Sequence, residues 1–250
     1  MVKLRKLKKF LDKELRVKKI KDSSENGLQV KCSSNVRKIG FAVDACLSTF
    51  DKAKYEGVDL LIVHHGLKWK PQKYKKITRI REKFLRRNKI SLYGVHLPLD
   101  AHTKYGNNVG LANILELEKK KRFAPYGNTM VGYKGVFKNE KKVEDIAKIL
   151  NKALSTKSKI FIFGKEKIKT IGIVSGGGGE NIEDAVRAKL DCLILGEMSL
   201  SEYHRVRDFG LTTILSGHYA TETVGVKLLM NLIKEKFNIE TIFIDNKTGV

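Results

Sequence analysis

Short apolar runs alternate with segments of helical periodicity along almost the whole of this 250-residue chain. Runs such as "IGFAV" (39–43) and "DLLIV" (59–63) are apolar throughout, which is typical of strands covered on both faces. The strands are expected at 28–32, 39–43, 59–66, 90–96, 130–137, 160–163, 170–179, 191–195, 211–217 and 240–244, and the helices at 2–19, 44–57, 72–88, from 107, 141–153, 180–188, 199–208 and 220–236. This alternation predicts an α/β fold with mostly parallel or mixed sheets.

The second half of the sequence echoes the first. "VDLLIVHHG" (58–66) is followed by a helical segment and then by "NKISLYGVHLPLD" (88–100). "LDCLILGEM" (190–198) is likewise followed by a helical segment and then by "GLTTILSGHYATE" (210–222). We therefore predict two related α/β halves, with the C-terminal segments able to pack back on the first. The halves are residues 1–124 and 125–250.

Histidines and carboxylates gather where the strands of both halves end. His64 and His65 close one apolar run, and both His96 and His218 have an acid four residues on. In open parallel sheets ligands bind at the carboxyl ends of the strands, and imidazole with carboxylate suits Zn, Fe or Mn. We predict a dinuclear site with two divalent ions in the cleft between the halves. Its candidate ligands are His64, His65, His96, Asp100, His218 and Glu222.

A structural role is the alternative for each of these histidines, because a single histidine at a strand end is more often a satisfied polar residue than a ligand. His64 and His65 also point in opposite directions in an ideal strand. Asp44, Glu197 and His204 are weaker candidates for supporting the ligands or moving a proton, and Glu197 and His204 are the candidate catalytic residues.

"SGGGGENIEDA" (175–185) follows an expected strand and opens a helix. Gly176, Gly177 and Gly178 could let backbone amides approach a phosphate at the start of that helix. The spacing matches neither the dinucleotide-binding fingerprint nor the P-loop. A tight turn in which bare backbone must pack is the alternative.

Positive charge is concentrated in two places. The formal net charge is +23, and residues 68–89 carry eleven lysines and arginines against Glu82 alone. Such a segment attracts polyanions, so nucleic acid is a candidate partner; the alternative is a solvated lysine-rich surface. The other basic stretch, residues 1–20, shows no apolar region of signal-peptide type, so a soluble cytoplasmic protein without a membrane partner is expected. The three widely spaced cysteines are expected to be reduced.

Several of these motifs resemble the Nif-three-like family, also called GTP cyclohydrolase 1 type 2-like. The similar segments are the double histidine after "DLLIV", "GVHLPLDAHTKYGNNVGLA" (94–112), "SGGGG" (175–179), "LGEMSLSEYH" (195–204) and "SGHYATE" (216–222). The resemblance covers about residues 25 to 245. It implies two α/β halves around a dinuclear metal centre and assembly into a homohexamer. The implied ligands are His64, His65, Asp100, His218 and Glu222, with His96 lining or completing the site.

This chain departs from the family in two respects. Many members have "HTNLD" where this chain has "HLPLD" (96–100), which keeps the histidine and the aspartate but not the polar pair between them. The chain also lacks the large inserted domain of many bacterial relatives. Three functions follow as hypotheses: a metal-dependent hydrolase acting on a nucleotide or phosphorylated small molecule, an iron or zinc carrier for cofactor assembly without turnover, and a basic nucleic-acid-binding protein.

Overall fold

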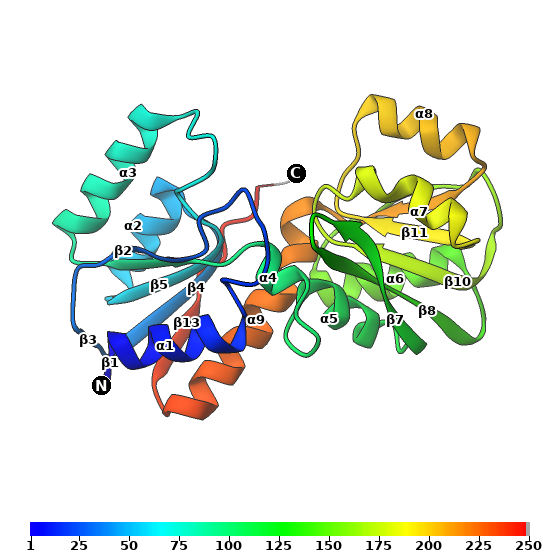
Figure 1. Cartoon of the computed structure of the whole chain (residues 1–250). Helices are drawn as coiled ribbons and strands as arrows, with labels where there is room; N and C mark the ends of the chain where they lie inside the picture. The colour runs from blue at the N-terminus through cyan, green and yellow to red at the C-terminus, as the bar shows by residue number, and fades with distance from the viewer. Residues whose placement is uncertain (249–250) are drawn as a thin grey trace. The chain divides into compact units, whose positions relative to one another are not determined.

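The computed structural model describes residues 1–248, and its contacts divide the chain into two units (Figure 1). Unit 1 comprises Met1–His102 together with Val226–Asn246, and unit 2 comprises Thr103–Gly225 with the residues from Lys247 onward. The boundary expected from the sequence lies at 124/125. Residues between 103 and 124 join unit 2 because helix α5 (Asn107–Ile114) packs against strands β8 (Thr129–Lys142) and β10 (Lys167–Val174).

Unit 1 is built on a five-stranded sheet with the order β13-β4-β5-β6-β2. Its strands are β2 (Gly27–Val30), β4 (Lys38–Asp44), β5 (Leu60–His65), β6 (Ser91–Gly94) and β13 (Glu240–Phe243). The four strands β13, β4, β5 and β6 run parallel, and β2 is antiparallel to β6. A separate two-stranded sheet joins β1 (Val2–Lys3) to β3 (Asn35–Val36).

Helices cover both faces of this sheet, which explains why its strands are apolar throughout (Figure 1). On one face α1 (Leu4–Glu14) and the second part of α9 (His218–Phe237) pack on residues such as Phe41. On the other, α2 (Leu47–Tyr55) and α3 (Lys75–Arg87) lie over the next side chain, Ala42, and its neighbours. Successive residues of one strand therefore enter two different cores.

Unit 2 contains a six-stranded mixed sheet with the order β7-β8-β10-β11-β12-β9. Its remaining strands are β7 (Glu118–Tyr126), β9 (Lys159–Phe161), β11 (Cys192–Leu195) and β12 (Thr212–Leu215). Strands β10, β11 and β12 are parallel. Helices α5 and α6 (Val143–Leu154) pack against β8, whereas α7 (Ile182–Arg187) and α8 (Leu200–Asp208) lie over the other face (Figure 1). A 3-10 turn (Gly179–Asn181) precedes α7.

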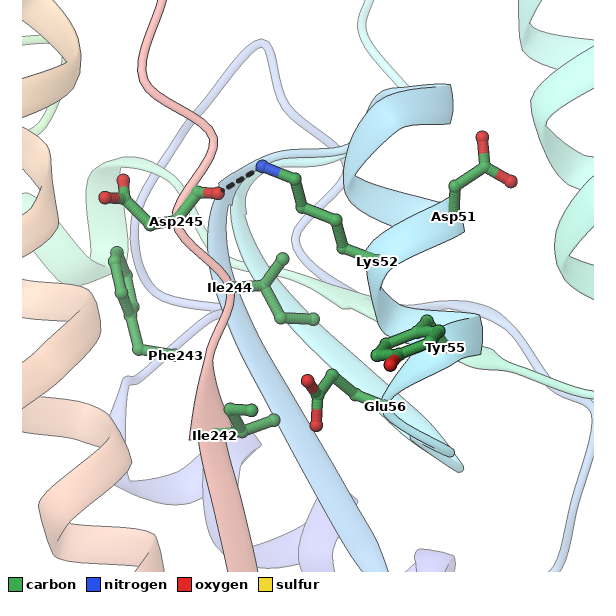
Figure 2. A pocket seen from close by; sticks show the side chains of 8 residues that line it. All are labelled: Asp51, Lys52, Tyr55, Glu56, Ile242, Phe243, Ile244 and Asp245. Atoms are coloured by element: carbon green, nitrogen blue, oxygen red, sulfur yellow. Dashed lines mark hydrogen bonds between the residues drawn. The ribbon is translucent and has the colours of Figure 1, made fainter.

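The segment 240–246 is fastened to the rest of unit 1. Strand β13 pairs in parallel with β4, and Lys52 Nζ on α2 donates a hydrogen bond of 2.7 Å to the carbonyl oxygen of Asp245 (Figure 2). A cavity of about 360 Å³ lies between α2 and the chain from Ile242 to Asp245. Figure 2 shows Tyr55 and Glu56 on one side of it.

The expected α/β class with mixed sheets is confirmed. Some expected boundaries were wrong. The first helix ends at Glu14 rather than at 19, because Arg16 takes a positive φ of 52° that a right-handed helix does not admit. Strand β7 was not expected. No helix in residues 1–248 is long and apolar enough to cross a membrane.

Candidate metal centre

Three histidines of unit 1 converge where two neighbouring strands end. His64 and His65 close β5, and His96 follows β6, the next strand of the sheet. Their ring centroids lie 4.7 to 5.6 Å apart, and one nitrogen of each lies within 4.8 Å of the others. His64 is buried, whereas His65 and His96 are partly exposed. The convergence predicted from the strand ends is therefore present within unit 1.

The Nδ1 atom of each of these rings faces an oxygen that can only accept. His64 Nδ1 donates to the carbonyl oxygen of Val95 at 3.0 Å. His65 Nδ1 lies 2.8 Å from Asp44 Oδ1, and His96 Nδ1 lies 3.0 Å from Asp22 Oδ1. A neutral imidazole carries one proton, so an acceptor at Nδ1 leaves the lone pair on Nε2. This arrangement orients the histidines of metal sites in proteins.

Asp22 fixes both the ring and the following backbone of His96. Its carboxylate also accepts from the amide nitrogen of Leu97 at 3.0 Å and from Asn26 Nδ2 at 2.8 Å. Burial raises the pKa of Asp22, but the hydrogen bond and charge of His96, with hydrogen bonds from Asn26 and Ser24, lower it to about 2. Asn26 in turn accepts from the amide nitrogen of His96 at 2.7 Å. The segment 22–26 thus holds His96 in place.

Asp100 is a further oxygen donor beside this cluster. It ends the short helix α4 (Leu97–Asp100), whose residues are all buried. One of its carboxylate oxygens lies 3.5 Å from His64 Nε2. Because the lone pair of that nitrogen faces a carboxylate, a cation between the two groups would satisfy both. Three imidazoles and one carboxylate fit Zn²⁺, Fe²⁺ or Mn²⁺.

Trp69 borders the same cluster. Its ring centroid lies 5.0 Å from that of His96 and 6.1 Å from that of His65. The indole nitrogen donates to the carbonyl oxygen of Gly66 at 2.8 Å, which fixes the ring. An apolar wall of this kind limits the access of water to the imidazoles.

Unit 2 contains a second pair of candidate ligands. His218 begins α9 directly after β12, and Glu222 lies one helical turn later on the same face. His218 Nε2 is 3.1 Å from Glu222 Oε1, and His218 Nδ1 is 2.8 Å from Glu197 Oε1. Both ring nitrogens therefore face carboxylates, although a neutral imidazole has only one proton to donate. A metal ion between Nε2 and the buried Glu222 would complete this arrangement.

The glycine-rich loop passes directly over this pair. Gly176 has a positive φ of 66°, and a Cβ at that position would lie 2.4 Å from Glu222 Oε1. The carbonyl oxygen of Gly176 accepts from the amide nitrogens of Gly196 and Glu197. A Cβ on Gly178 would lie 2.5 Å from Val174 Cβ, whereas one on Gly177 would be 3.7 Å from its nearest neighbour, Glu197 Oε1. Close packing explains Gly176 and Gly178; the phosphate-binding role stays a prediction.

The whole chain matches a family model, that of Duf34/NIF3 (NGG1p interacting factor 3), over residues 2–249. The chain belongs to the DUF34/NIF3 family. The resemblance stated from the motifs is thereby confirmed.

Relatives and solved structures agree with this family over the full length. A protein of Pyrococcus horikoshii described as a GTP cyclohydrolase 1 type 2 homolog is 47% identical over 243 residues, which are 96% of this chain and 97% of that protein. The homolog of Archaeoglobus fulgidus is 36% identical over 97% of both chains. TTHA1606 from Thermus thermophilus is similar in structure, with a TM-score of 0.90, 35% identity and complete coverage of both chains. Reduced HcgD from Methanocaldococcus jannaschii has a TM-score of 0.85 and 26% identity over 98% of each chain.

The other residues that the sequence analysis named have varied surroundings in this NIF3 chain. Asp44 contacts Nδ1 of His65 and Glu197 contacts Nδ1 of His218, which is where residues that support ligands would lie. His204 lies on the exposed side of α8, where its ring contacts Tyr203 at 5.5 Å. Its catalytic role, and that of Glu197, stay predictions.

Asp22 was missed by the sequence analysis. It lies 74 residues before its partner His96, in a segment without regular secondary structure. The nearby sequence "DSSEN" (22–26) has the composition of a turn. Only the hydrogen bonds of the fold distinguish this aspartate from other surface acids.

Proposed function

We propose that this protein binds two divalent metal ions at one dinuclear centre, to which both units contribute ligands, and uses them in hydrolysis. The proposed ligands are His64, His65, His96 and Asp100 of unit 1 and His218 and Glu222 of unit 2. Fe, Zn and Mn are the metals that suit this donor set.

The observation that supports the proposal most directly is the hydrogen bonding of the four imidazoles at Nδ1. Each Nδ1 faces a carbonyl or carboxylate oxygen at 2.8 to 3.0 Å. Histidines that only fill a core do not need the same nitrogen blocked four times. Blocking Nδ1 fixes the tautomer in which Nε2 can bind a metal.

The two candidate ligands of unit 2 are too few for a catalytic metal site of their own. His218 and Glu222 offer two ligands, whereas a catalytic zinc in proteins commonly has three, together with an open position. The sharing of ligands by the two units is what the resemblance implies.

Hydrolysis of a nucleotide or of another phosphorylated small molecule is the proposed reaction, because several relatives are described as GTP cyclohydrolase 1 type 2 homologs. Paired divalent ions, when bound, supply Lewis-acid chemistry for such reactions. Glu197 orients His218, and its partly exposed carboxylate is the group that we propose exchanges a proton with solvent. Trp69 covers part of the imidazoles of His65 and His96 from water.

A metal carrier without turnover is the second candidate function. The side chains of His65, His96 and His218 are 21%, 20% and 29% exposed. Partly exposed ligands suit the transfer of an ion to an acceptor, whereas a structural site is closed.

The homohexamer expected from the resemblance also stays a prediction, which light scattering would test.

The test is the metal content per chain of protein purified without chelator, followed by a panel of nucleotides and sugar phosphates. We expect about two ions per chain in the wild type and a clear loss in His65→Ala and Glu222→Ala. His204→Ala is the control, since that residue lies on the exposed side of α8, and it should keep both ions.

Metal content near zero that is not restored by Fe, Zn or Mn would overturn the proposed site. Bound metal without turnover on the panel, together with release of the ion to a chelating acceptor, would favour the carrier over the hydrolase. Circular dichroism of each variant establishes that it is folded.

A further inference from the structure

Helix α3 exposes a set of positive charges that the fold does not use. Six basic side chains of this helix are exposed, and so is Lys73 just before it. The helical ones are Lys75, Lys76, Arg79, Lys83, Arg86 and Arg87. None of them forms an ion pair within residues 1–248. The one acid of the helix, Glu82, lies 3.6 Å from Lys68 instead.

The bases in the first turn and those that repeat along one face do not stabilise the helix. Lys75 and Lys76 stand in the first turn, which contains no acidic residue. Bases in a first turn meet the positive end of the helix dipole. Lys75, Arg79, Lys83 and Arg87 also follow one another at intervals of four, the spacing at which like charges destabilise a helix.

The basic helix α1 of the same unit carries a shorter stripe, Arg5, Lys9 and Lys13, and its other two bases have partners. Lys8 forms an ion pair with Asp12, and Lys6 lies over the ring of Phe237 at 5.9 Å. Both helices have bases in the last turn, Lys13 in α1 and Arg86 and Arg87 in α3, where the helix dipole favours a cation. What distinguishes α3 is its longer stripe and, within residues 1–248, the lack of acidic partners for its exposed bases.

The charges of α3 form a continuous stripe. Four residues of α-helix rise about 6 Å, so the stripe from Lys75 to Arg87 is about 18 Å long. It is longer than a single nucleotide and matches a linear polyanion, in which charges repeat along the chain.

The apolar side of α3 is already covered. Leu85 is fully buried, and Phe84 packs against Phe50 of α2 with ring centroids 6.1 Å apart. A helix that lies on a membrane needs a broad apolar face available to lipid. Ile77 and Ile80 are the only large apolar side chains exposed on α3, at 37% and 46%, which is too little for that purpose.

We propose that the exposed face of α3, together with Lys73, binds the phosphate backbone of a nucleic acid without reading its sequence. Binding neutralises the like charges of the stripe and releases counterions from the nucleic acid. Tyr74, 74% exposed at the start of the helix, offers a ring on which an unpaired base can stack.

The test is fluorescence anisotropy with labelled oligonucleotides of mixed sequence, single- and double-stranded, at low and moderate salt. The test variant is Lys75→Gln/Arg79→Gln/Lys83→Gln. The control is Arg5→Gln/Lys9→Gln/Lys13→Gln on α1, which removes the same charge from three exposed residues of the same unit.

We expect the wild type to lose roughly 100-fold in affinity between about 50 and 200 mM salt if four phosphates are contacted. The test variant should bind at least about tenfold more weakly at low salt, with a shallower salt dependence, and the control should match the wild type within about twofold. Binding should be the same with and without chelator, which separates this proposal from the metal centre. Tyr74→Ala should weaken only the single-stranded complex.

No binding at low salt, or equal losses in both triple variants, would overturn the proposal. Binding to vesicles of anionic lipid in preference to either oligonucleotide would overturn it in favour of a membrane surface. Both triple variants are expected to be no less stable than the wild type. Their thermal unfolding is measured to exclude loss of fold as the cause of weaker binding.

Discussion

Asp44–His65 in unit 1 and Glu197–His218 in unit 2 are the same device built twice. In each, a carboxylate at or just after the end of one strand accepts from the Nδ1 of a histidine at or just after the end of the neighbouring parallel strand, at 2.8 Å and 21 residues away. A helix of nine residues, α2 or α8, connects the two strands. Both helices are followed by a glycine at positive φ, Gly57 at 67° and Gly210 at 62°.

The surroundings of the two devices differ. Unit 1 adds an adjacent histidine on the same strand and another after the next strand, the latter held by a buried aspartate. Unit 2 adds only Glu222, from the next turn of α9, under a loop of bare backbone. One strand–helix–strand module thus orients a single imidazole, and the elements around it supply the remaining donors.

The largest effect is expected from Gly176→Ala, which affects unit 2 alone. An alanine would be strained at a φ of 66°, and its Cβ would displace the Glu222 carboxylate that lies 2.4 Å away. We expect loss of bound metal and a decrease of about 1–3 kcal/mol in the free energy of unfolding. Gly177→Ala is the matched control, because its Cβ finds ordinary contact at 3.7 Å. Equal behaviour of the two variants would refute the packing role of Gly176.

A smaller effect is expected from removing either carboxylate of the repeated device. Asp44→Asn and Glu197→Gln keep the shape of the side chain but weaken its hold on Nδ1. Loss of such a partner typically lowers metal affinity by about 10- to 100-fold. Competition with a chromophoric chelator measures it. Similar decreases in the two variants support equivalent devices; a decrease in only one breaks the comparison.

The smallest effect concerns Asp22, the aspartate that only unit 1 has. The pKa of this group is lowered from 3.8 to about 2 in the folded protein. Its contribution to stability is therefore complete above the unfolded pKa and is lost as the pH falls toward the folded one. We expect a loss of about 1 kcal/mol between about pH 5 and pH 3. Denaturant unfolding of metal-free protein measures it. Asp22→Asn should lack this component of the pH dependence; an unchanged profile contradicts the assignment.

Most of the fold could be predicted because unit 1 and the core of unit 2 consist of apolar runs between helical segments. Strand β7 could not, since "EKKKRFAPY" is basic, mostly exposed and contains a proline. Such a composition suits an edge strand and gives no periodic signal. His218 lies beyond a strand end as expected, but that strand ends at Leu215 rather than at 217 and α9 begins at His218 rather than at 220.

The candidate site could be predicted in part. His64, His65 and His96 stand at strand ends, and parallel neighbours bring such ends together. Asp44 and Glu197 could be named but not assigned a partner, because the 21-residue spacing acquires meaning only when the strands pair. Asp22 gave no signal, since its contact with His96 depends on the path of an irregular segment.

Unit 1 is assembled from the two ends of the chain, and this affects how the protein is made. Its core includes Val226, Leu229 and Ile233 of α9, and its sheet includes β13. All strands of unit 2 lie between Thr103 and Gly225. During synthesis all strands of unit 2 are therefore available before unit 1 is complete. Domains generally fold in the opposite order, from the N-terminus. The N-terminal segment must wait, incomplete, until Phe243 has left the ribosome.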